Sequence, residues 1–216
     1  MNIPREDSPL RLGVLASGGG TNLQAILDRI QEGALRAEVR VVIGNNSQAG
    51  ALARARARGI PAPHLSSLKF PDPDDLDRAI LRTLQDRQVE VVALAGYMKR
   101  LGPRTLAAYS NRILNVHPAL LPAFGGQGMY GIRVHEAVIA EGVKLTGVTV
   151  HFVDEVYDHG PIIAQAAMPV EDDDTPETLA RRVLALEHAL LPEVIGWMAG
   201  GRVRVEGRKV YVKRET

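Results

Sequence analysis

Residues suited to chemistry gather in three short segments of the sequence. The first is Ser17-Gly18-Gly19-Gly20-Thr21-Asn22, which lies between an apolar run and a helical pattern. Glycines let the backbone approach an oxyanion closely, and the first N–H groups of a helix point at it with the positive end of the helix dipole. The spacing matches neither GxGxxG nor GK[ST], which disfavours a dinucleotide fold or a P-loop NTPase. The segment predicts a phosphate site; a tight strand-to-helix turn is the simpler alternative.

The second segment, Asn115-Val116-His117-Pro118, directly follows the start of another apolar run. Asn115 offers an amide donor that does not titrate, and histidine exchanges a proton readily near neutral pH. Together they suit an oxyanion that forms and collapses while a proton moves. A histidine before a proline is also common as a structural loop residue, so the catalytic interpretation depends on its place beside Asn115 at the end of a strand.

The third segment is the acidic turn 154–161, which contains Asp154 and Asp158. A carboxylate here could hold His117 protonated or take a proton, if the turn folds over the same cleft. From the residues alone, the better interpretation is a solvated turn rich in Asp and Gly. The acids at 171–174 are interpreted as favouring the dipole of the helix that follows them. No histidines have HExxH or similar ligand spacing, so we expect no metal site.

The elements that must position these segments alternate between strands and helices. Strands are expected at 12–16, 39–43, 62–65, 89–95 and 113–116, and helices at 22–33, 49–58 and 74–87. Strands apolar on both faces, alternating with helices, are typical of a parallel sheet covered on both sides. Ligands of such sheets gather beyond the carboxyl ends of the strands. The glycine loop, 96–98 and 115–117 each follow a strand, so we expect them to face one cleft.

The last third of the chain predicts a different arrangement. Alternating apolar and polar residues over 146–152 predict a half-buried strand, with 161–168 as its hairpin partner. A long helix is expected over 176–199, with Thr175 as N-cap and Pro176 as the first helical residue. A last hairpin is expected over 203–212. The fold class is therefore α/β, a doubly wound and mostly parallel sheet with a C-terminal antiparallel hairpin region and a long helix.

Composition and charge narrow the function classes. The 216 residues are 45% hydrophobic, enough for a real core, and we expect one domain over 1–216 with an N-terminal extension at 1–10. The formal charge of +1 gives no electrostatic reason to expect nucleic acid or a membrane surface as partner. The sequence has no cysteine, no run as apolar and long as a membrane helix, and no secretory signal pattern at its start. A cytoplasmic protein is the expectation.

At these residues the chain resembles the phosphoribosylglycinamide formyltransferases, folate-dependent enzymes of purine synthesis. The resemblance covers 10–199 and rests, in this order, on LASGGGTNLQ, LAGYMKRL, ILNVHPALLP, GVTVHF, DHGPII and Leu186-Glu187-His188. It implies a Rossmann-like formyltransferase fold. It also implies transfer of the formyl group of 10-formyltetrahydrofolate to the amine of 5′-phosphoribosylglycinamide, a step of purine (IMP) biosynthesis.

The resemblance also implies roles for individual residues. The catalytic trio falls on Asn115, His117 and Asp158, with a protonated His117 and Asn115 stabilising the oxyanion and Asp158 sustaining the histidine charge. Residues implied to bind the amine substrate are Gly20, Thr21, Asn22, Pro118 and Glu187. Residues implied to form the formyl-folate pocket are Met98, Lys99, Arg100, Leu101, Asn115, Asp154 and Asp158. The partners are then small molecules, without nucleic acid or membrane, and the protein is a monomer or homodimer.

Two stretches depart from the family pattern. Segment 71–74 (PDPD) stands where many relatives carry an arginine, and 124–131 (FGGQGMYG) is longer than the corresponding loop of some members, so neither receives a binding role. The nearest rivals are a methionyl-tRNA or amino-sugar formyltransferase and a folate deformylase, which usually carry an additional domain or, for tRNA, a basic surface. A nucleotide-binding oxidoreductase is disfavoured because Gly44-Asn45-Asn46 stands where an acid would follow the second strand. A non-catalytic phosphate-binding module would leave the implied trio unexplained.

Overall fold

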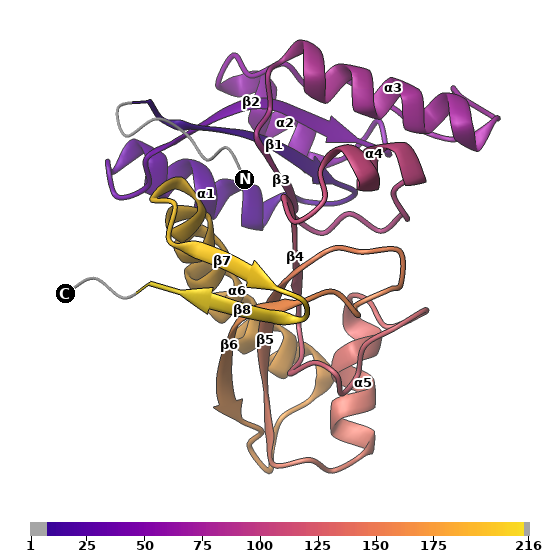
Figure 1. Cartoon of the computed structure of the whole chain (residues 1–216). Coiled ribbons are helices and arrows are strands. Elements are labelled where there is room, and N and C mark those ends of the chain that lie inside the picture. The colour runs from indigo at the N-terminus through magenta and orange to yellow at the C-terminus, as the bar shows by residue number, and fades with distance from the viewer. Residues whose placement is uncertain (1–7, 214–216) are drawn as a thin grey trace.

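A six-stranded sheet forms the centre of the protein, whose computed structural model describes residues 8–213 (Figure 1). Its strands in chain order are β1 (Leu10–Ala16), β2 (Ala37–Gly44), β3 (Val91–Leu94), β4 (Ile113–His117), β5 (Leu145–Phe152) and β6 (Ile162–Pro169). They lie side by side in the order β2-β1-β3-β4-β5-β6. The first four are parallel, whereas β5 runs antiparallel to both β4 and β6. A separate hairpin pairs β7 (Val203–Glu206) with β8 (Lys209–Val212).

The described part of the chain also contains six helices. They are α1 (Thr21–Gln31), α2 (Gly50–Ala57), α3 (Pro73–Asp86), α4 (Pro103–Ala108), α5 (Ile132–Ala140) and α6 (Pro176–Ala199). Side chains of α1, α2, α5 and α6 pack in one core cluster with alternate residues of the strands. Those of α3 and α4, which lie side by side in Figure 1, pack in a second cluster with the intervening strand residues. Helices thus cover both faces of the sheet, which confirms the expected doubly wound α/β fold.

The long helix α6 begins where the sequence predicts. Thr175 is its N-cap, with a side-chain oxygen that accepts the Thr178 N–H at 3.3 Å, while the Thr178 hydroxyl accepts the Thr175 N–H at 2.8 Å. Pro176 occupies the first helical position, where its missing N–H costs nothing. This reciprocal cap fixes the start of the helix that carries Glu187.

Some expected elements differ in the structure. Segment 62–65 is not a strand: it forms only a bridge between His64 and Gly44, because Pro61 and Pro63 have no N–H and only accept bonds from β2. The strand β5 is buried on both faces along 146–152 rather than half-buried. Its polar face is covered by the segment after β4, whose Ala119 carbonyl bonds the Thr149 hydroxyl at 2.7 Å. Helices α4 and α5 were not among the expected elements.

The two ends of the described chain bear on the remaining expectations. Of the extension expected at 1–10, residues 1–7 lie outside the described part, and β1 already begins at Leu10. The hairpin expected over 203–212 is present as β7 and β8. Over residues 8–213, none of the helices has both the length and the apolar character needed to cross a bilayer.

Candidate active site

One cavity of about 690 Å³ lies at the carboxyl ends of β3 and β4, a size typical of small-molecule sites. Its wall is formed by 96–101 after β3, 115–118 of β4 and the turn after it, the loop 126–131 with the start of α5, the turn 153–158, and Glu187 of α6. Predicted site residues that line it are Met98, Lys99, Arg100, Leu101, Asn115, His117, Pro118, Asp154, Asp158 and Glu187. The topology therefore brings together segments that are distant in the sequence.

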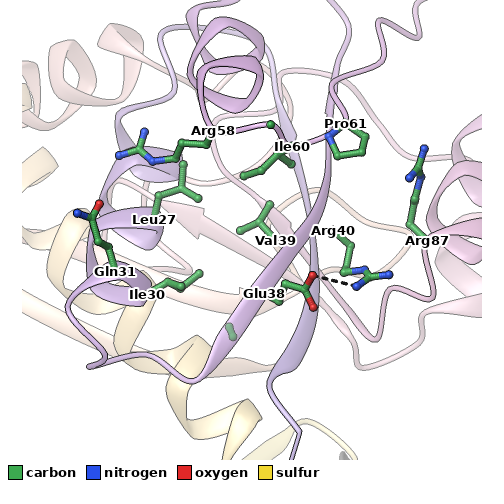
Figure 2. A pocket seen from close by; sticks show the side chains of 12 residues that line it. Leu27, Ile30, Gln31, Glu38, Val39, Arg40, Arg58, Ile60, Pro61 and Arg87 are labelled. Atoms are coloured by element: carbon green, nitrogen blue, oxygen red, sulfur yellow. Dashed lines mark hydrogen bonds and ion pairs between the residues drawn. The ribbon is translucent and has the colours of Figure 1, made fainter.

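A second groove, of about 630 Å³, lies on the outer side of the edge strand β2 (Figure 2). Apolar side chains form its floor, and the carboxylate of Glu38 is bound to Arg40 at 2.9 Å. The groove is lined by neither histidine nor aspartate. The first cavity is the candidate active site, because it brings Asn115, His117 and Asp158 together.

Asn115 is oriented by the antiparallel pairing of β4 with β5. The register places His151 of β5 directly opposite Asn115, and the asparagine Nδ2 lies 3.0 Å from the histidine Nε2. The His151 Nδ1 lies 2.7 Å from the Phe152 carbonyl, which only accepts, so Nδ1 carries the proton and Nε2 accepts from Asn115. His151 was not assigned a role from the sequence. It contacts Asn115 across two strands, and only the register of β5 against β4 could have predicted this contact.

His117 lies at the end of β4, almost completely buried. Its Nε2 donates to the Phe124 carbonyl at 2.8 Å, which leaves Nδ1 facing the Asp158 carboxylate at 3.6 Å. Burial lowers the pKa of His117 below its usual value, although the charge of Asp158 opposes this effect. Burial and the Asp158 carboxylate therefore act in opposite directions on the protonation of His117, and the protonated ring implied by the resemblance stays a prediction.

Asp158 is not the solvated residue that the turn composition suggested, since its side chain is 11% exposed. Its carboxylate accepts the Gly126 N–H at 2.9 Å and lies 3.4 Å from the Asn115 Nδ2. Burial by itself would raise the pKa of Asp158, but the neighbouring His151 and His117 and the Gly126 N–H outweigh it and hold the pKa below its usual value. The carboxylate is therefore ionised at neutral pH and faces both His117 and Asn115.

The glycine loop precedes α1 and contacts the cavity wall at both of its ends. At the first end, the Ser17 N–H donates to the Gly96 carbonyl at 3.0 Å and the Ser17 hydroxyl accepts the Met98 N–H at 2.7 Å. The Asn22 side chain donates from Nδ2 to the Glu187 carboxylate at 2.6 Å, whereas Gly20, Thr21 and Asn22 do not line the cavity themselves. Gly20 is left-handed, with φ 76°, and an added Cβ would lie 2.6 Å from the Cα of Ala51. Burial raises the pKa of Glu187 to about 7, against the opposing effect of its bond from Asn22.

Several residues of the site had no role assigned from the sequence. His135 of α5 is buried against the cavity, its Nδ1 has no partner in the described part of the chain, and burial lowers its pKa. The loop 126–131, which received no role, lines the cavity, and Phe124 just before it binds His117. Segment 71–74 lies outside the cavity lining, where Asp72 caps α3 by accepting the Asp74 N–H at 2.9 Å. Among the described residues, no group of three His, Cys, Asp or Glu side chains could hold a metal ion.

Comparison with known proteins finds similar chains over most of the sequence. A family model described as formyl transferase matches residues 10–195. A chloroplastic phosphoribosylglycinamide formyltransferase from Arabidopsis thaliana is 42% identical, over 90% of this chain and 67% of the relative. The phosphoribosylglycinamide formyltransferase of Bacillus subtilis (strain 168) is 39% identical, over 88% of this chain and 95% of the relative. Among solved structures, glycinamide ribonucleotide transformylase 1 from Symbiobacterium toebii superposes with a TM-score of 0.90 at 45% identity, over 98% of both chains.

Proposed function

Because the chain belongs to the formyl transferase family, we propose that it transfers the formyl group of 10-formyltetrahydrofolate to the amine of phosphoribosylglycinamide. The products are N-formyl glycinamide ribonucleotide and tetrahydrofolate, in de novo purine biosynthesis. The observation that carries the proposal is the meeting of Asn115, His117 and Asp158 at one cavity, close to a glycine loop suited to phosphate.

The first chemical step is attack of the amine nitrogen on the formyl carbon, which turns the formyl oxygen into an oxyanion. Asn115 supplies an amide N–H for this oxygen. One of its Nδ2 hydrogens is held by His151 at 3.0 Å, whereas the contact to Asp158 is long, at 3.4 Å, and is readily exchanged for a stronger one. A donor of this kind contributes about 3–4 kcal/mol to the transition state.

The amine loses a proton as it forms the new C–N bond, and His117 is placed to receive it. Its Nε2–H is committed to the Phe124 carbonyl, so the proton arrives at Nδ1. The resulting imidazolium faces the ionised Asp158 at 3.6 Å, which offsets the cost of charging a buried ring. Collapse of the intermediate breaks the bond between the formyl carbon and the folate nitrogen, which takes the proton.

Different residues are assigned to the two substrates. We assign the phosphate to the N–H groups of Gly20, Thr21 and Asn22, which lie next to the cavity through the bond from Asn22 to Glu187. The rest of the amine substrate is assigned to Pro118 and Glu187 in the cavity wall. The formyl-folate lies between Met98–Leu101 and the Asp154–Asp158 turn, together with Asn115. Exposed Met98, Tyr130 and Tyr157 give the mouth an apolar rim suited to an aromatic ring system. One domain, a cytoplasmic location, a monomer or homodimer, and the absence of metal and nucleic acid remain predictions.

The proposal is tested with the purified protein, 10-formyltetrahydrofolate and phosphoribosylglycinamide, by following release of tetrahydrofolate. We expect release that depends on the amine, and loss of activity in His117→Ala with the fold retained. His64→Ala is the matched control, because His64 contacts the Asn45 carbonyl and does not line the cavity. Tetrahydrofolate release without the amine would indicate a deformylase. Turnover only with methionyl-tRNA or an amino sugar would assign a different acceptor.

A further inference from the structure

The glycine loop is held from one side by α2. The Gly18 carbonyl accepts the Ala51 N–H at 3.1 Å, and the Gly19 carbonyl accepts a bond of 2.9 Å from Nε of Arg54. Arg54 also donates from Nη1 to the side-chain oxygen of Gln24 at 2.8 Å. One partly buried guanidinium therefore ties the loop to both α1 and α2.

These bonds determine where the N–H groups of the loop point. The peptide bonds of the loop are trans, and in a trans peptide unit the N–H points opposite to the C=O. Since the carbonyls of Gly18 and Gly19 face α2, the N–H groups of Gly19 and Gly20 face away from it. The Gly20 carbonyl is bound within the first turn of α1 by the Gln24 N–H at 2.9 Å. Successive N–H groups around a left-handed residue such as Gly20 form a concave anion site.

The glycine loop packs so closely against α2 that no side chain fits between them. A Cβ added at Gly50 would lie 2.8 Å from the Gly19 oxygen, and one added at Gly20 would lie 2.6 Å from the Cα of Ala51. The position of the Gly19 carbonyl is therefore set by α2, with Arg54 as the side chain that binds it.

We infer that Arg54 is a positioning residue for the phosphate of the amine substrate, an inference that rests on the proposed role of the glycine loop. Its guanidinium holds the Gly19 oxygen away from the phosphate, which that oxygen would repel, and so directs the Gly20 N–H toward it. Its positive charge also favours a dianion at this loop. Arg54 does not line the cavity, so it acts on binding of the phosphorylated substrate rather than on the formyl transfer.

Steady-state kinetics of Arg54 variants test the inference. In Arg54→Ala, we expect KM for phosphoribosylglycinamide to rise about tenfold, while kcat and KM for 10-formyltetrahydrofolate change by less than about twofold. Arg54→Lys retains the charge and restores part of the affinity. Gly50→Ala displaces the same carbonyl from the other side and raises the same KM. Arg56→Ala is the matched control, since this exposed arginine of α2 contacts the Ala62 carbonyl instead of the loop.

Binding of ribose 5-phosphate, followed by amide NMR, separates this inference from the proposed function. In the wild type, we expect shifts at the Gly19, Gly20 and Thr21 amides, and a Kd about tenfold weaker in Arg54→Ala. Absence of those shifts in the wild type would remove the phosphate assignment of the loop, and the inference with it. Two results would overturn the role of Arg54 alone. One is that the wild type shows the shifts but Arg54→Ala binds ribose 5-phosphate with the same Kd. The other is that Arg54→Ala has an unchanged KM for phosphoribosylglycinamide.

Discussion

The Nδ1 atom of His117 lies 3.6 Å from the carboxylate of Asp158, while the Nε2 of the same ring is committed to a backbone carbonyl. This arrangement allows one nitrogen to gain a proton and places a negative charge where the proton arrives.

Replacing Asp158 by Asn should lower kcat by about 10²–10³ without unfolding the protein, because the imidazolium formed at His117 loses its counter-charge. The charge of Asp158 opposes the lowering of the His117 pKa, so this pKa should fall further in the variant. NMR titration of the His117 ring, together with steady-state kinetics, measures both effects. An unchanged His117 pKa would contradict the assigned contact.

Replacing His151 by Leu should lower kcat about tenfold with little change in either KM, because Asn115 loses the acceptor that orients its amide. The loss should be smaller than that of Asn115→Ala, which removes the donor itself. Kinetics of the two single variants and the double variant provide the measurement. If His151 acts through Asn115, the double variant is no slower than Asn115→Ala; additive losses would show that it acts independently.

Replacing Glu187 by Gln should stabilise the fold above neutral pH but weaken substrate binding. The pKa of Glu187 is about 7 in the fold and 4.5 as a free side chain, so the folded state binds the extra proton between these values. Its contribution to stability is fully present below pH 4.5 and is lost as the pH rises through 7. Urea unfolding at pH 8 should show Glu187→Gln more stable than the wild type by about 1–2 kcal/mol, with little difference near pH 4.5.

The same variant should bind phosphoribosylglycinamide more weakly, seen as a higher KM, because the carboxylate proposed to contact this substrate is gone. The control is Glu193→Gln, a change on the same helix at a residue outside the cavity lining. Equal stability of Glu187→Gln and wild type at pH 8 would contradict the raised pKa.

Replacing Thr149 by Val should destabilise the fold by about 2–3 kcal/mol. The Thr149 hydroxyl donates to the Ala119 carbonyl at 2.7 Å and accepts the Leu121 N–H and the Gln165 side-chain amide, each at 3.0 Å. Valine keeps the shape but leaves the buried Ala119 carbonyl and Leu121 N–H without this partner, whereas the Gln165 amide keeps its bond to the Leu121 carbonyl at 2.9 Å. Urea unfolding measures the loss, and Thr146→Val is the control, since the buried Thr146 hydroxyl has no partner in the described part of the chain. Equal costs for the two variants would contradict the role of these bonds.

Much of the fold could be predicted from the sequence because its local signals are strong. Apolar runs predicted β1 to β4, and Thr175-Pro176 predicted the start of α6. Segment 62–65 was wrongly predicted as a strand, because Pro63 within it and Pro61 just before it have no N–H to donate to a neighbouring strand. The short helices α4 and α5 lack the long periodic pattern that makes a helix recognisable.

The candidate site was only partly visible in the sequence. Asn115 and His117 stood out because both lie on one strand end, two residues apart. Asp158 was interpreted as solvated from its own residues, since its burial depends on the Gly126 N–H and on two histidines from β4 and β5. The positioning contact of His151 depends in the same way on the register of β5, which composition does not reveal.

The strand β4 is paired along both of its edges, with β3 on one side and β5 on the other. Deuterium from solvent can therefore reach its inner amides only when the sheet separates, so their exchange should be among the slowest in the protein. Because Asn115 and His117 belong to this strand, their relative positions are kept for as long as the sheet stays paired. The loop 126–131 and the turn 154–158 also line the cavity but lie outside the sheet, so they can move without separating any paired strands.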